Sequence, residues 1–508
     1  MKYLNKFFLL LLIPVGSIIF SSCSKGYLDV NDDPNRATEN TITPQLIFTG
    51  AEVGVGARQA SGNFNFLDHW MGYFAPNGDF APNFKEQTYD LDFSFGDALW
   101  QNHYNTLFDL YQVKTKSLVA GGDSVLAGSS MILSAKLFQE LVDLYGNIPY
   151  SQAFQVRQYP TPAYDKAQDI YTSLLLSLDT AISYMNLTPL KSFAGVDVIF
   201  KGNQGKWIRF ANTLKLRLLI RQSEVSGFSP TAELAKIQSA GGILEDGESV
   251  TVNPGYVNDV DKQQPFYANY GYTPVANKAT TSDNANAYIV GILSSSTDPR
   301  IDRFFQPVGN AYVGDVYGDK QSDIPSSANS SYFGPGLIGE GLDDGTGATQ
   351  DQWILPSFEA MFLKAEAIAR GWLPGDAKTA YQNAVTESFV WLGVPDAESE
   401  ATSYYTSEDN TIANWDEGAG STVTSRVKFI AFQKYIALTG IDPLESYSDQ
   451  RRLNFLPDNG YITKNAAKLS NSLPVRLLYP QSEYTTNGAN ALAEGDIDQF
   501  TSKIFWQP

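Results

Sequence analysis

The feature that most constrains this chain is its single cysteine, Cys23, among 508 residues. No intramolecular disulfide can form, so the fold must be held by packing and hydrogen bonds alone. Hydrophobic residues make up 43% of the sequence, which is enough for a large core. The lone thiol stands close to the N-terminus.

The residues before Cys23 have the pattern of a secretory leader. Lys2 and Lys6 are basic, residues 7–20 are mainly apolar, and two serines precede the cysteine. The alternative, an uncleaved membrane helix, needs about 20 apolar residues, and this stretch is shorter. The pattern favours residues 1–22 as a lipoprotein signal peptide and Cys23 as the lipidated residue of the mature chain.

The charge of the chain excludes one class of partner. Lysine and arginine number 36 against 55 acidic residues, a net charge of −19. Nucleic-acid backbones are bound by clustered basic side chains, so we expect no nucleic-acid partner. Charged residues are only 18%, while Gly (41) and Pro (25) are numerous. This composition favours long polar loops on a folded scaffold.

Helical periodicity recurs through most of the chain. Apolar residues spaced by three and four predict helices, and Trp100, Tyr104, Phe108 and Tyr111 are expected to face the core. The predicted helices are 44–55, 97–119, 124–145, 165–185, 207–222, 231–239 and 423–439. Residues 357–392 read as a helix, a turn and a second helix with small residues between them, and they resemble a tetratricopeptide repeat.

These elements predict a mainly α fold for residues 23–508. Tetratricopeptide-like helix pairs form a scaffold, mainly 44–240 and 355–440. The segment 241–352 is rich in Gly, Asn, Ser and Tyr, has one expected helix at 284–293, and reads as a loop-rich insert. Loops of this length inside a compact domain are usually functional or disordered. The C-terminal segment 441–508 is expected to be irregular, with Tyr479 and Trp506 docking onto the body.

Few residues offer catalytic or metal chemistry. The only histidines, His69 and His103, are interpreted as structural, and no zinc-ligand spacing is present. Acidic residues are numerous, so their number alone does not exclude the pair of catalytic carboxylates that a glycosidase needs. Four of them lie in the helical segments: Glu359, Glu366, Glu445 and Asp449. Helix caps and salt bridges explain these four more simply, so we predict no catalysis.

Two oxygen-rich stretches bear on cofactors. Asp29–Asp33 begins like a calcium loop, but Pro34 replaces the required glycine and Asn40 the final glutamate. A looser cluster runs from Asp343 to Asp351. We predict no cofactor and no metal-ligand residues, and leave open a structural calcium ion.

Aromatic residues concentrate between residues 64 and 111, where 14 of 48 positions are Phe, Tyr or Trp against 13% for the chain. Some lie in a loop with prolines and asparagines. Exposed rings beside amides suit sugars, because rings stack on the apolar C–H face of a sugar and amides hydrogen-bond to its hydroxyls. A second zone is the FYANYGY stretch in the insert. The predicted ligand-binding residues are Asn77, Phe80, Asn83, Phe84, Tyr89, Tyr267, Tyr270 and Tyr272. The alternative for each ring of the first loop is that it pins the loop to the body.

Six segments in order resemble the SusD/RagB family of outer-membrane nutrient-binding lipoproteins of Bacteroidetes, in its starch-binding-associated branch. They are YLDVNDDPN (27–35), LVDLYGNIPY (141–150), KWIRFANTLKLRLLIR (206–221), FEAMFLKAEAIARGW (358–372), QKYIALTGIDPLESYSDQRR (433–452) and LPVRLLYPQSEYTTN (473–487). The resemblance implies four tetratricopeptide-like pairs and a loop-rich ligand face. It also implies a SusC-like TonB-dependent transporter as partner.

The resemblance and the leader together predict the function. We expect a lipid-anchored outer-membrane protein, facing the cell exterior, that binds oligosaccharides for import through the transporter. Three alternatives remain at this point: an oligopeptide-binding RagB-like protein, a surface glycoside hydrolase, and a purely structural tetratricopeptide adaptor. The sequence does not identify the sugar.

Overall fold

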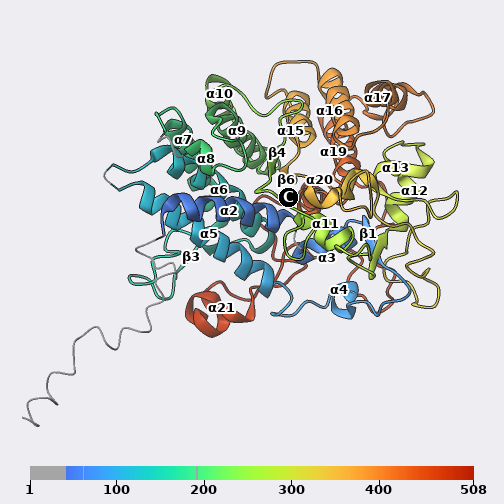
Figure 1. Cartoon of the computed structure of the whole chain (residues 1–508), viewed down its shortest axis with the longest axis horizontal. Helices are drawn as coiled ribbons and strands as arrows, with labels where there is room; N and C mark the ends of the chain where they lie inside the picture. The colour runs from blue at the N-terminus through green and yellow to red at the C-terminus, as the bar shows by residue number, and fades with distance from the viewer. Residues whose placement is uncertain (1–41, 61, 120, 190–192) are drawn as a thin grey trace, which may run out of the picture. The chain divides into compact units, whose positions relative to one another are not determined.

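The computed structural model describes residues 42–60, 62–119, 121–189 and 193–508 (Figure 1). Cys23, the predicted signal peptide and the Asp29–Asn40 stretch lie outside these residues. The mainly helical fold predicted from the periodicity is confirmed. The described residues from Pro44 to the C-terminus form one compact unit.

The first helical group is built around one buried helix. This is α6 (Ser124–Tyr145), which begins at the cap Asp123, whose carboxylate accepts from the amides of Val125 and Leu126. It ends at Gly146, whose φ of +76° suits glycine. The helices that pack with it are α2 (Pro44–Gln59), α5 (Asp97–Ser117), α7 (Ala167–Met185) and α9 (Gln204–Arg221).

Among the described residues, α6 is the one helix long and apolar enough to cross a membrane. Within its apolar window, 89% of the residues are buried inside the fold. Its apolar character is therefore used in the core, where α5 and α7 pack against it.

The second helical group contains the predicted helix pair. In Figure 1, α15 (Ser357–Ala369), α16 (Ala377–Trp391) and α19 (Val423–Ala437) lie side by side, with α17 (Ala397–Thr406) against α16. Ala365 and Ala384 are fully buried, which allows close approach of the helices. The two groups meet where α9 packs on α15.

The strands are short and paired in twos. They are β1 (Phe74–Pro76) with β5 (Asp283–Ala285), β2 (Ile148–Pro149) with β3 (Tyr164–Asp165), and β4 (Val250–Val252) with β6 (Gln352–Leu355), all antiparallel. In the first pair Phe74 lies opposite Ala285 and Pro76 opposite Asp283. This pairing fixes the early aromatic loop against the insert.

The insert contains more helix than its composition predicts. Besides the expected helix, here α12 (Ala287–Ser295), it forms α11, α13, α14 and the 3-10 turn η3. Their bounds are Pro265–Tyr270, Ile301–Phe304, Pro335–Ile338 and Gly347–Thr349. These helices have at most six residues, too short to show a periodic stripe, and caps and tertiary contacts hold them.

The C-terminal segment is also more ordered than predicted. The helix α20 (Pro443–Leu453) is almost wholly buried, and its polar residues hid it from a search for apolar stripes. The docking predicted for Tyr479 and Trp506 is confirmed, because both are fully buried. The remaining helices are α3 (Asn65–Trp70), α4 (Phe84–Thr88), α8 (Phe193–Val196), α10 (Thr231–Ser239), α18 (Trp415–Gly418), α21 (Gln481–Thr486), α22 (Gly488–Ala493) and the 3-10 turn η2 (Gly62–Phe64).

One detail of the predicted core is wrong. On α5 the buried face carries Leu99, His103, Leu107 and Leu110, with Trp100 at its edge. Phe108, predicted to face the core, is 41% exposed. The aromatic spacing follows a face rotated from the buried one, because the aliphatic residues between the rings take the core position.

Candidate functional site

A cavity of about 540 Å³ opens beside the aromatic loop. Its walls come from α3, the loop 76–83, α4, residues 92–99 and the start of β5. Most of these segments lie in the aromatic-rich stretch 64–111, and β5 belongs to the insert. A cavity of this volume suits a small ligand such as a few sugar rings.

Aromatic rings supply the apolar side of the cavity. Phe80 is 48% exposed and stands on the loop, where its ring is available for stacking. Phe66 and Phe95 lie deeper, with ring centroids 5.0 Å apart in an edge-to-face arrangement. Phe95 in turn stacks on the buried Trp70 at 6.1 Å. The floor is therefore rigid, and Phe80 is the ring that a ligand meets first.

Polar groups also line the cavity. Asn83 is exposed, and its side-chain oxygen caps α4 by accepting from the amide of Glu86 at 3.4 Å. Lys85 pairs with Asp92 at the rim. Asn65 donates its amide to Asp283 Oδ2 at 3.2 Å. Amide and charged side chains of this kind fix the orientation of a polar ligand.

The loop that carries Phe80 is held firmly. Asp79 Oδ2 accepts from the amide of Ser327 at 2.8 Å, and Gln321 donates to the carbonyl of Phe80 at 2.8 Å. Gly78 is required here, because a Cβ would lie 2.3 Å from the carbonyl oxygen of Ile324. A ring presented by a fixed loop loses little entropy when it binds.

His69 lies at the base of the cavity between two carboxylates. Its Nδ1 is 2.6 Å from Glu86 Oε1 and its Nε2 is 3.0 Å from Asp283 Oδ1. Burial opposes the charged ring, but Glu86 and Asp283 outweigh it and raise the pKa of His69 to about 10. Tyr317 also donates to Glu86 at 2.9 Å. The imidazolium ties α3, α4 and β5 together beneath the ligand space.

The structure distributes the predicted binding residues of the first zone unevenly. Phe80 and Asn83 line the cavity. Phe84 is 60% exposed but does not line it. Asn77 is fully buried, donating to Thr281 O at 2.7 Å and to Asn284 Oδ1 at 2.9 Å. Tyr89 is fully buried edge-on against Trp70, as in the alternative in which a ring pins the loop.

The second zone reaches the cavity only from behind. Tyr267 is buried and donates to the carbonyl of Leu342 at 2.8 Å. Tyr270 is 5% exposed, and its hydroxyl accepts from Asn65 at 3.3 Å. Tyr272 is half-buried against Tyr332. The two predicted zones are thus brought together through Asn65, with Tyr270 supporting a cavity residue instead of lining the cavity.

Several residues that line the cavity were not predicted from the sequence. Phe66 and Phe95 lie in the aromatic-rich stretch, but nothing in their spacing separates them from core rings. Asn65, Asp92 and Asp283 carry no local motif. Asp283 reaches the cavity through the β1–β5 pairing, which joins segments about 200 residues apart and leaves no short-range pattern.

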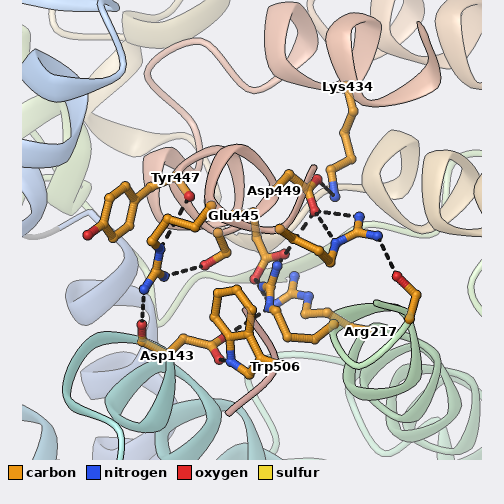
Figure 2. Close-up of polar contacts among 12 residues, drawn as sticks. Asp143, Arg217, Lys434, Glu445, Tyr447, Asp449 and Trp506 are labelled. Carbon is orange, nitrogen blue, oxygen red and sulfur yellow. Dashed lines mark hydrogen bonds and ion pairs between the residues drawn. The ribbon is translucent and has the colours of Figure 1, made fainter. Parts of the chain in front are cut away.

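The four carboxylates considered for hydrolysis lie elsewhere, in a buried network of ion pairs. Figure 2 shows side chains from distant segments converging on α20. Arg221 contacts Glu445 at 2.6 Å and Asp143 at 3.1 Å, Arg217 contacts Glu359 at 2.6 Å, and Arg452 contacts Glu366 at 2.6 Å. Lys434 contacts Asp449 at 2.7 Å, and Trp506 donates to Asp143 at 2.9 Å.

The charged groups of this network stabilise the fold. Burial would raise the pKa of Asp449, but Lys434, Arg452 and Arg221 outweigh it and lower the pKa. Burial likewise opposes the charge of Glu445, and Arg217 and Arg221 lower its pKa. These groups are fully buried and face basic side chains, so they are placed to join helices.

The second oxygen-rich stretch is used by turns. Asp344 Oδ1 accepts from the amide of Thr346 at 2.8 Å, and Asp351 accepts from Asn253 at 2.9 Å. Within the described residues, no group of three or more His, Cys, Asp or Glu side chains is arranged to hold a metal ion.

Comparison with known proteins places this geometry in context. Residues 34–480 match the SusD-like family, described as starch-binding and associating with the outer membrane. No curated protein sequence matches the chain. The fold is similar to a chitin-binding SusD homologue from Flavobacterium johnsoniae, with a TM-score of 0.73 and 23% identity over 90% of this chain and 98% of that one.

Two further solved structures agree. A SusD/RagB family protein from Bacteroides thetaiotaomicron has a TM-score of 0.72 and 20% identity over 92% of this chain and 99% of that one. A SusD homologue from Bacteroides fragilis has a TM-score of 0.70 and 20% identity over the same shares. At these identities the likeness shows a shared fold, so ligand assignment rests on this chain's own cavity.

Proposed function

The chain belongs to the SusD-like family, and from that membership we propose that it binds oligosaccharides at the cell surface as a lipid-anchored outer-membrane protein. It then passes them to a SusC-like TonB-dependent transporter. Lipidation at Cys23, the outward orientation and the transporter are parts of the proposal that come from the leader and the family resemblance.

One observation carries the ligand class. The cavity beside α4 combines an exposed ring, Phe80, with the polar side chains of Asn83, Lys85 and Asp92. Sugars offer an apolar C–H face and a rim of hydroxyls, so a cavity with both an exposed ring and amide and carboxylate groups matches both. The chitin-binding neighbour supports the same ligand class at the level of the fold.

The cavity also bears on the hydrolase alternative. Glu86 and Asp283 line it, but both contact His69, which is positively charged at neutral pH. Burial would raise the pKa of Asp283, yet His69, Ser282 and Asn65 lower it. A glycosidase acid needs a raised pKa, so Asp283 suits binding better than proton donation. We propose binding without turnover.

The test compares two exposed phenylalanines of the same segment. Phe80→Ala should weaken binding of neutral oligosaccharides by about 1–3 kcal/mol, because a stacking ring is lost. Phe84→Ala is the matched control and should leave affinity unchanged, because Phe84 is exposed outside the cavity. Both variants should melt at the wild-type temperature.

The binding panel contains glycans and oligopeptides, titrated calorimetrically, with chromatography of the glycans afterwards. Equal affinities of the two variants would contradict the site. Peptide binding without glycan binding would favour the RagB-like alternative. Shortened glycans, produced at a rate that Glu86→Gln abolishes, would establish hydrolysis.

A further inference from the structure

A second, smaller cavity of about 190 Å³ lies among α5, α6, α7 and residues 150–155. It shares no residue with the cavity beside α4. Its walls combine polar groups with aromatic and aliphatic side chains, among them Tyr111, Lys114, Ala135, Phe138 and Phe154. This second cavity plays no part in the proposed binding of oligosaccharides.

Phe154 is held in an unusual backbone conformation. Its φ is +67°, a region that bulky residues rarely occupy and that persists only when neighbours enforce it. The preceding residues are fixed, because Asp165 Oδ2 accepts from the amides of Tyr150 at 3.0 Å and Ser151 at 2.8 Å. In this conformation the centroid of the Phe154 ring lies 5.5 Å from that of Tyr111 and 6.5 Å from that of Phe138.

A single cation stands at this cavity. Lys114 lines it, with its ammonium 6.0 Å from the centre of the Tyr111 ring. In the part of the chain that the structure describes, Lys114 forms no ion pair, although the net charge of the whole chain is −19. Burial lowers the pKa of Lys114, since no carboxylate offsets the loss of water. An anion brought by a ligand would supply the missing partner.

The volume limits what the cavity holds. A cavity of about 150 Å³ lined by apolar side chains accepts one benzene molecule. At about 190 Å³, this one has room for a six-membered ring and a small group beside it. Aromatic walls favour an aromatic guest packed edge to face.

We propose that this cavity binds an aromatic carboxylate, with its ring packed against Tyr111, Phe138 and Phe154 from the cavity side and its carboxylate on Lys114. The same chemistry occurs in free aryl acids and at the end of a peptide that terminates in phenylalanine. At a peptide end, the carbon next to the carboxylate carries an amide nitrogen. A free aryl acid such as phenylacetate lacks this group, so two probes separate the two sources.

The test titrates the full-length protein with phenylacetate, its neutral analogue phenylacetamide, and N-acetylphenylalanine, followed by calorimetry and NMR. Phenylacetate should bind saturably, and phenylacetamide roughly tenfold more weakly, because the charge-assisted contact is lost. Lys114→Met should remove this difference. Tighter binding of N-acetylphenylalanine than of phenylacetate assigns the site to peptide ends, and the reverse order assigns it to free acids.

Two control variants keep the result interpretable. Lys116→Met changes a lysine of the same helix that does not line the cavity, and it should bind phenylacetate normally. Ala135→Leu grows into the cavity and should abolish binding of all three probes, with its fold checked by melting and by retained glycan binding. If Ala135→Leu does not fold, Lys114→Met decides. The proposal fails if phenylacetate does not saturate, if phenylacetamide binds equally well, or if Lys114→Met binds phenylacetate like the wild type.

Discussion

At the scale of single residues, exposure separates functional rings from structural ones. Phe80 and Tyr89 lie nine positions apart in one aromatic segment, yet Phe80 is 48% exposed and Tyr89 is fully buried. The difference arises from α4, which turns the chain between them and sends Tyr89 toward Trp70. Composition can identify such a segment, but tertiary contacts decide which ring faces water.

The charge of His69 should make the stability of the fold depend on pH. Its pKa of about 10 lies above its unfolded value of about 6.5, so the protonated ring stabilises the fold. This stabilisation is fully present below about pH 6.5 and is lost as the pH rises through about 10. Replacement by glutamine, which cannot be charged, should cost roughly 2–4 kcal/mol at pH 6 and much less at pH 10.5.

Urea unfolding of wild type and His69→Gln at both pH values measures this difference. A penalty for His69→Gln that stays constant between pH 6 and pH 10.5 would show that the ring is not held as a cation.

At the scale of elements, long helices follow from the sequence and short ones do not. The predicted 124–145 helix has its bounds as found, because Asp123 and Gly146 mark its ends and apolar residues fill it. By contrast, α20 has a polar sequence, and its burial depends on partners from α6, α9, α15 and α19. A helix stabilised by ion pairs with distant segments has no local apolar pattern to read.

The ion pairs of α20 give the element-scale prediction. Arg452 contacts Glu366 at 2.6 and 2.9 Å and Asp449 at 2.8 Å, and all three side chains are buried. Arg452→Met leaves two buried carboxylates without their common partner, which should cost about 3–5 kcal/mol of unfolding free energy. Equilibrium unfolding in urea measures this cost.

A surface pair provides the control for Arg452. Lys262 contacts Asp259 at 2.7 Å with both side chains more than half exposed, so Lys262→Met should leave stability unchanged. Adding Glu366→Gln to Arg452→Met should recover part of the loss, because one unpaired charge is removed. Equal stability of Arg452→Met and the wild type would contradict a structural role for the network.

At the scale of the whole molecule, the order of family-like segments predicted the fold better than any single motif. Residues 34–480 match the family, and the solved neighbours cover about nine-tenths of the chain. Only the first predicted zone contributes lining residues to the cavity: residues from 62 to 99 and from 282 to 283 meet there, and Tyr267, Tyr270 and Tyr272 do not line it. The identity of the sugar depends on hydroxyl contacts that neither pattern nor fold specifies.

The anchor is tested on the whole protein in cells. Cys23→Ala removes the thiol to which a lipid would be attached, so the protein should leave the membrane fraction and appear in soluble fractions. Cys23→Ser is a second variant with the same expectation, and Phe80→Ala should remain in the membrane fraction. A Cys23→Ala protein that still pellets with membranes would disprove lipid anchoring at this residue.

The central claim is that the cavity beside α4 binds an oligosaccharide. The most direct measurement is a crystal structure of the protein with the tightest-binding neutral glycan from the panel. The account predicts a sugar ring stacked on Phe80, with a hydroxyl hydrogen-bonded to Asn83 and the loop 76–83 unmoved. A glycan bound at another surface, with the cavity beside α4 empty of sugar, would contradict it.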